Sequence, residues 1–126
     1  MMSAMGLFSV DIEVSRPTGR AVPRRVRGVV VDTGAEMTWI GGETLREAGI
    51  GVRKKDQPFV MANGQQVTRD VGYAIIRCGP FETIDEVVFA RPGDLQLLGA
   101  RTLEGFNATV DSRRKRLVAA GPMPAA

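Results

Sequence analysis

The chain has 126 residues, of which 44% are hydrophobic and 25% are charged, a balance that fits a folded domain and excludes wholesale disorder. It contains no histidine and one cysteine, Cys78, which excludes Ser-His-Asp and Cys-His catalysis and the common zinc sites. Acid–base chemistry must then come from carboxylates, from lysine or from the single tyrosine, Tyr73. We expect neither a metal ion nor a cofactor.

The sequence also bears on where the protein works. No apolar run approaches the roughly 18 residues that a membrane-spanning helix needs. The N-terminus lacks the basic-then-apolar pattern of a signal peptide, and a lone cysteine cannot form an internal disulfide. We therefore expect a cytoplasmic protein that does not associate with membranes.

The net charge is +3, and the excess of basic residues is concentrated in two clusters. These clusters consist of Arg16, Arg20, Arg24, Arg25 and Arg27, and of the Arg-Arg-Lys-Arg run at 113–116. Neither is interleaved with aromatic residues, as surfaces that bind single-stranded nucleic acid tend to be. We interpret both as solvated loops and expect no nucleic acid as a partner; a nucleic-acid-binding protein that uses these clusters is an alternative.

Alternating and β-branched apolar patterns predict a series of short strands. Their ranges are 7–14, 26–31, 37–40, 58–61, 66–77, 81–90, 97–99, 107–110 and 117–120. The run 26–31 is apolar enough to be buried on both faces, and it follows a Pro-, Gly- and Arg-rich loop at 15–25. A short helix is expected at 43–48, where Gly49 ends it, and a helical turn at 101–104.

Two hairpins are expected among these strands. Asn63-Gly64 lies between two strand-like arms and is a strong hairpin signal, because both residues tolerate a positive φ. The basic turn at 111–116 separates the last two strands. Many short strands with little helix indicate a mainly β fold.

The length favours a single domain over residues 1–126. Its ends, at about 1–5 and 121–126, should be loose. No internal repeat is visible in the chain.

Asp32 directly follows the apolar run at 26–31, where a carboxylate is costly unless it is paired or used. Gly34 permits backbone geometry that other residues resist, and it allows a second backbone to approach closely. Ala35 leaves space beside the carboxylate. In an isolated Asp-Thr-Gly the Asp more often caps a turn than takes part in catalysis. The choice between these two interpretations therefore depends on the rest of the sequence.

Four segments of the chain together resemble the retropepsin-like (retroviral-type) aspartic protease family, and its small stand-alone prokaryotic members in particular. They are VDTGAEMTWI (31–40), ANGQQVTRDVG (62–72), LLGARTL (97–103) and DSRRKRL (111–117). The resemblance implies a closed acid-protease barrel, mainly β, with one short C-terminal helix. It also implies a homodimer that acts as an aspartic endopeptidase on extended peptides or proteins.

The resemblance assigns a role to each matched residue. Asp32 would be the catalytic carboxylate, and the Thr33 hydroxyl would bond across the dimer. Gly34 would offer its carbonyl to the substrate, and Ala35 would line a side-chain pocket. The flap that closes over the substrate would consist of Met61, Ala62, Asn63, Gly64 and Gln65. The support beneath the active-site loop would be Leu97, Leu98 and Gly99.

The chain also departs from the retroviral pattern. Ala100 follows the late glycine where the retroviral enzymes usually have arginine, and Arg101 comes next. The active-site loop keeps one acidic residue, Glu36, and has Met37 where a second is usual. We expect Ala35, Trp39, Ile40 and Leu98 to form pockets that favour apolar side chains.

Peptide hydrolysis of this kind needs two carboxylates, one ionised to activate water and one protonated to bond the scissile carbonyl. The chain has a single Asp-Thr-Gly, so a two-fold axis would have to supply the second Asp32 from another chain. Terminal strands are the expected interface. An inactive relative that binds peptides or acts as a scaffold dimer is the main alternative, and a phosphate loop of the sugar-kinase kind would need a longer chain.

Overall fold

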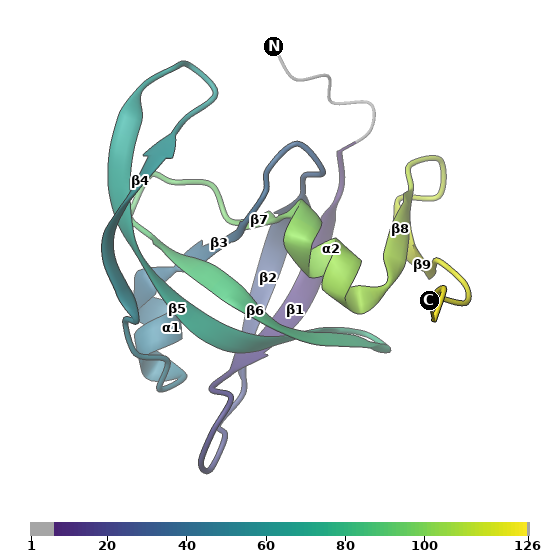
Figure 1. The fold of residues 1–126 in the computed structure, drawn as a ribbon, viewed down its shortest axis with the longest axis horizontal. Coiled ribbons are helices and arrows are strands. Elements are labelled where there is room, and N and C mark those ends of the chain that lie inside the picture. Colours follow the sequence, from purple (N-terminus) through teal and green to yellow (C-terminus); the bar gives the residue numbers. More distant parts are fainter. Residues whose placement is uncertain (1–6, 126) are drawn as a thin grey trace.

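The computed structural model describes residues 7–125, in which nine strands and two short helices follow one another (Figure 1). The strands are β1 (Ser9–Ser15), β2 (Arg24–Val31), β3 (Thr38–Gly41), β4 (Lys54–Val60), β5 (Gln66–Cys78), β6 (Phe81–Ala90), β7 (Leu97–Leu98), β8 (Ala108–Asp111) and β9 (Arg116–Ala119). The helices are α1 (Gly42–Glu47) and α2 (Ala100–Phe106). The mainly β prediction is confirmed, and α1 confirms the short helix expected at 43–48, which the fold has besides the C-terminal helix implied by the resemblance.

Seven strands form one sheet in the order β1-β2-β7-β3-β6-β5-β4, and β1 also pairs with β5. This last pairing, antiparallel with Val14 opposite Ile76, connects the first strand of that order to the sixth. The short β7 lies between β2, to which it is parallel, and β3, to which it is antiparallel. The chain segment that contains β7 is therefore fixed between the two strands that flank the Asp32 loop. The closed barrel and the homodimer remain predictions.

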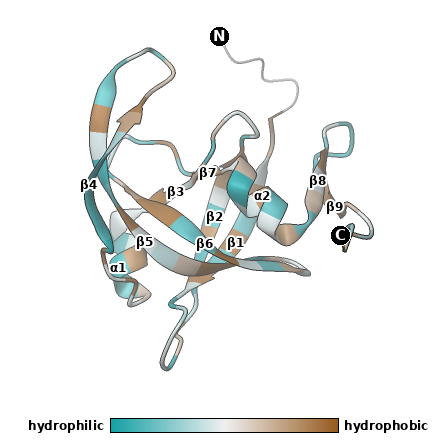
Figure 2. Ribbon diagram, in the orientation of Figure 1, coloured by the Kyte–Doolittle hydropathy of each residue, from teal (hydrophilic) through white to brown (hydrophobic). Residues whose placement is uncertain are grey.

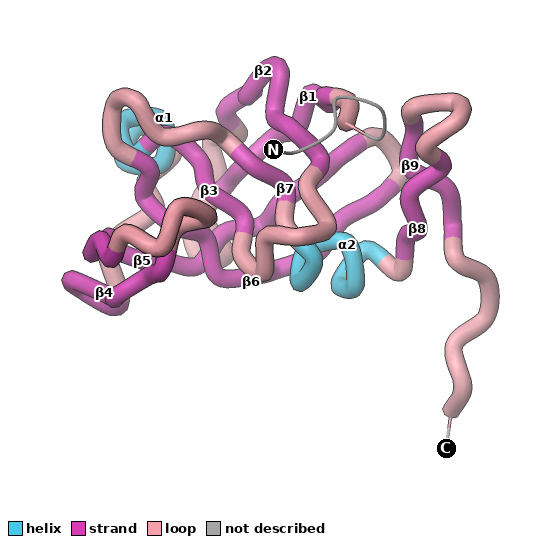
Figure 3. Tube along the Cα trace, turned by 90° about the horizontal axis from the view of Figure 1, so that it is seen from above, coloured by secondary structure: helices cyan, strands magenta, loops and turns pink. Residues whose placement is uncertain are grey.

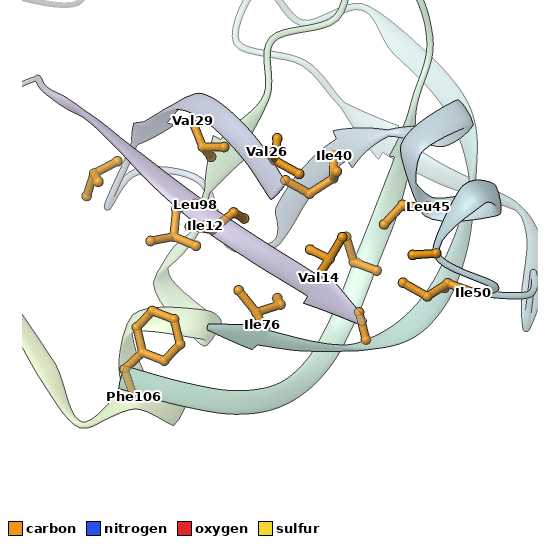
Figure 4. Close-up of a cluster of buried hydrophobic side chains, with 14 of the residues drawn as sticks. Ile12, Val14, Val26, Val29, Ile40, Leu45, Ile50, Ile76, Leu98 and Phe106 are labelled. Atoms are coloured by element: carbon orange, nitrogen blue, oxygen red, sulfur yellow. The ribbon is translucent and has the colours of Figure 1, made fainter. Parts of the chain in front are cut away.

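Apolar side chains from most of these elements converge on one core (Figure 4). Its largest fully buried members include Ile12, Ile40, Leu45, Ile76 and Leu98. Hydrophilic residues dominate β4 (Figure 2). In β5, alternation places Ala74 and Ile76 inside and Tyr73 and Arg77 outside. The last four residues of β6 are all buried, alternately in this core and in a second cluster.

Strand β2 is not buried on both faces, so that expectation was wrong. Val29 and Val31 are buried, but Arg27 and Gly28 are exposed. A register shift against β1 accompanies a positive φ of 68° at Gly28, and the Gly28 amide donates to the Asp11 carboxylate at 3.1 Å. The apolar run therefore contains a bulge that turns polar backbone outward.

The C-terminal part forms a separate two-stranded sheet of β8 and β9. Figure 3 shows this hairpin at the opposite end of the molecule from α1, with the tail after β9 running away from it. Residues 121–125 are exposed and have no regular structure, whereas the expected loose segment at 1–5 lies outside the described residues. Neither helix in the described part is long and apolar enough to cross a membrane.

Candidate active site

The Asp32 loop begins where β2 ends, at Val31, and closes as a tight turn. The Ala35 amide donates to the Asp32 carbonyl at 3.1 Å, and the Gly34 amide donates to the Asp32 carboxylate oxygen Oδ1 at 2.9 Å. A Cβ on Gly34 would lie 3.2 Å from that same oxygen, so glycine keeps the approach to the carboxylate open. Asp32 is half-buried, while Thr33 and Gly34 are exposed.

Strand β7 and the residues that follow it hold this loop by backbone hydrogen bonds. The Asp32 amide donates to the Leu98 carbonyl at 3.0 Å, and the Ala100 amide donates to the Ala35 carbonyl at 2.8 Å. Gly99 lies so close to the Met37 carbonyl that a Cβ would overlap it. The structure thus brings together the two sequence segments predicted as active-site loop and support, with glycine at the point of closest approach.

A buried chain of hydroxyl groups extends this support to β6. The Gly99 amide donates to Thr38 Oγ1 at 3.0 Å, and Thr102 Oγ1 donates to the Asp85 carboxylate at 2.8 Å. The two hydroxyls lie 2.6 Å apart. Because the Thr102 proton is directed to Asp85, the Thr38 hydroxyl must donate to Thr102. Both threonines are fully buried, so each hydroxyl needs these partners.

The predicted flap residues form the turn between β4 and β5. The Met61 amide donates to the Gln65 carbonyl at 2.8 Å, and the Gly64 amide donates to the Met61 carbonyl at 2.8 Å. Gly64 has a φ of 85°, but Asn63 does not have a positive φ; its side chain instead accepts from the Gln65 amide at 2.9 Å. Ala62 to Gln65 are exposed and Met61 is half-buried. The hairpin is confirmed, whereas the positive φ expected at Asn63 is not.

The flap arms and the active-site loop meet in a second apolar cluster around Trp39. The rings of Trp39 and Phe59 have centroids 5.1 Å apart, and Met37 and Met61 pack against the same cluster. Figure 1 shows the β4–β5 turn, in teal, and the β2–β3 connection, in dark blue, rising on the same side of the molecule. The face between them is therefore bounded by apolar side chains from both elements.

This cluster corrects the expected pocket. Ile40 and Leu98 are fully buried in the main core, so they cannot contact a ligand, and Trp39 is also buried. Ala35 remains half-buried in the loop. Met37, which is half-buried at the edge of the cluster, was not among the predicted pocket residues, because it precedes β3 and its place beside the flap residues depends on the fold of the whole chain.

Charged groups near the loop also differ from the retroviral pattern. Arg101, one position later than the usual arginine, lies with its guanidinium 3.4 Å from the Glu36 carboxylate. Both side chains are substantially exposed, so this pair contributes little stability. Within residues 7–125 no hydrogen bond or ion pair links Asp32 to a second carboxylate.

Comparison with known protein families agrees with these features. A model of the family described as "gag-polyprotein putative aspartyl protease" matches residues 24–105. The chain belongs to the retropepsin-like aspartic protease family. The matched part of this family member runs from β2 to α2 and includes the Asp32 loop, the flap hairpin and the segment around β7. A search of curated proteins found no match.

Proposed function

We propose that this family member is an aspartic endopeptidase and that it works as a homodimer in which two copies of Asp32 share one active site. The observation that supports this most strongly is the placement of Asp32. Its carboxylate stands at the end of β2, half-buried, with its main chain bonded to Leu98 and one oxygen bonded to Gly34. A turn held at both ends fixes the direction of the carboxylate, as a catalytic acid requires.

In the proposed reaction, one Asp32 carboxylate is ionised and takes a proton from a water molecule. The other is protonated and donates a hydrogen bond to the scissile carbonyl. Two carboxylates about 3 Å apart do not both ionise readily, so the pair holds a single proton.

The substrate would be an extended peptide that lies between the flap turn and the Asp32 loops. An extended chain can hydrogen-bond to exposed backbone groups, as in β-augmentation, while its side chains alternate between pockets. Met37 and Met61 would offer flexible apolar surface on either side of such a peptide. We propose that this function involves no nucleic acid, membrane or cofactor. We also propose that the protein acts in the cytoplasm.

Cleavage of a peptide library tests this proposal. We expect cuts at sites flanked by apolar side chains, because the cluster around Trp39 supplies apolar surface, and a rate that passes through a maximum with pH, because the pair must hold one proton. The products can be identified by mass spectrometry at several pH values. A library cut mainly between charged residues would contradict the substrate preference, and binding without cleavage at any pH would favour an inactive peptide-binding dimer.

A further inference from the structure

The apolar face of the flap arm carries one charged residue, Arg69. Residues two apart on a strand share a face, and Arg69 lies on β5 between Val67 and Val71, which both belong to the cluster around Trp39. An arginine in such a row is unfavourable unless its charge is paired. The partner of the Arg69 guanidinium therefore indicates the role of this residue.

Asp94, from the turn between β6 and β7, supplies that partner. Arg69 Nε and Nη2 donate to the two Asp94 carboxylate oxygens at 2.8 and 2.9 Å, a bidentate geometry that lysine cannot reproduce. The side chains are only 11% and 12% exposed. The hydrogen bond from Arg69 holds the pKa of Asp94 below its ordinary value. The pair is thus a shielded contact with defined geometry.

The Arg69 guanidinium also contacts the apolar cluster itself. Its central carbon lies 6.0 Å from the centroid of the Trp39 ring, at the outer limit of a cation–π contact, and Trp39 in turn packs on Phe59 of β4. Both flap arms, β4 through Phe59 and β5 through Arg69, therefore meet at Trp39.

On its other side, Asp94 is fixed in a turn that continues into β7. The Arg91 amide donates to the Asp94 carboxylate at 2.8 Å. Two residues after Asp94, the Gln96 carbonyl accepts a hydrogen bond of 3.0 Å from the Val30 amide. Val30 is the second-last residue of β2. Two more residues bring the chain to Leu98, whose carbonyl accepts from the Asp32 amide. A short, hydrogen-bonded stretch thus runs from the flap arm to the active-site loop.

We propose that Arg69 is a positioning residue, which sets the flap relative to the Asp32 loop through its bidentate pair with Asp94. The inference rests on the proposed function, because a flap needs a defined position only where it closes on a substrate. Arg69 itself does not touch the reacting groups.

The test compares Arg69→Gln with Arg77→Gln. Arg77 lies on the same strand, but its pair with Glu82 is about half exposed and it lies at the end of β5 away from the flap turn. Trp39 is the single tryptophan, so quenching of its fluorescence by acrylamide reports the packing of the flap arms without any need for activity. Peptide cleavage gives kcat and KM separately.

For Arg69→Gln we expect stronger quenching of Trp39, a raised KM and a kcat/KM lowered about tenfold, because small misplacements of a substrate-positioning element reduce rates steeply. Arg77→Gln should match wild type in both measurements. If Arg69→Gln does not fold, Arg69→Lys replaces it, which keeps the charge and loses the bidentate pair. Unchanged quenching in the folded variant overturns the inference, even where stability falls. If wild type cleaves nothing, the proposed function fails, while the quenching comparison still decides whether Arg69 positions the flap.

Discussion

Replacing Asp32 with asparagine is expected to abolish peptide hydrolysis while the protein still folds and dimerises. Asparagine keeps the shape of the side chain, and its oxygen can still accept the hydrogen bond from the Gly34 amide. It cannot take a proton from water, so we expect the rate to fall by about 10²- to 10⁴-fold or more. Activity is measured on a peptide that wild type cleaves, and folding is measured by thermal unfolding.

Asp56→Asn is the matched control for this change. Asp56 is exposed and lies in the β4 strand with a φ of 54°, a conformation that asparagine adopts readily. The same loss of one carboxylate there should leave both activity and stability near wild type. An Asp32→Asn protein that keeps more than a few per cent of wild-type activity would contradict the catalytic assignment.

Leu98→Ala is expected to cause a large loss of stability. The Leu98 side chain is 0% exposed in the main core, so its truncation removes buried apolar surface and leaves a cavity. Such changes lower the free energy of unfolding by about 2 to 5 kcal/mol. Because the Leu98 carbonyl also accepts from the Asp32 amide, relaxation into the cavity should disturb the active-site loop and lower kcat as well.

Leu95→Ala is the control, since it makes the same truncation three residues earlier in the same segment. Leu95 is 64% exposed, and we expect the free energy of unfolding to change by no more than about 0.5 kcal/mol. Chemical denaturation of both variants gives the comparison. Equal free energies of unfolding for the two variants would contradict a role of the Leu98 side chain in supporting the Asp32 loop from the core.

Much of the fold could be predicted from the sequence because the residue types that favour strands are a local signal. The strands predicted at 66–77 and 81–90 correspond closely to β5 and β6, which are rich in β-branched and aromatic residues. Strand β2 was misjudged because its run of valines suggests burial on both faces, whereas a bulge at Gly28 turns part of the strand outward. The start of β4 was missed because its first residues, Lys54 and Lys55, are polar and exposed.

The candidate site was predictable only where its residues are adjacent in the chain. The Asp-Thr-Gly-Ala turn and the flap turn each consist of consecutive residues, so their patterns could be recognised. Thr38 and Thr102 are 64 positions apart and Arg69 and Asp94 are 25 apart. No local sequence pattern indicates that the residues of such a pair are in contact. Their contact depends on the tertiary arrangement of the strands and turns that carry them. Met37 was missed for a related reason, since its exposure depends on the flap hairpin that packs over it.

Mixing of subunits tests most directly whether two chains share one site. Wild type and Asp32→Asn are dissociated, combined in equal amounts and allowed to reassociate. Random pairing leaves about a quarter of the dimers with two wild-type chains, and a mixed dimer has one carboxylate where the reaction needs two. We therefore predict that activity per wild-type chain falls to about half. Activity that simply follows the amount of wild-type chain, whatever the amount of variant present, would mean that each chain carries a complete site and would contradict the shared Asp32 pair.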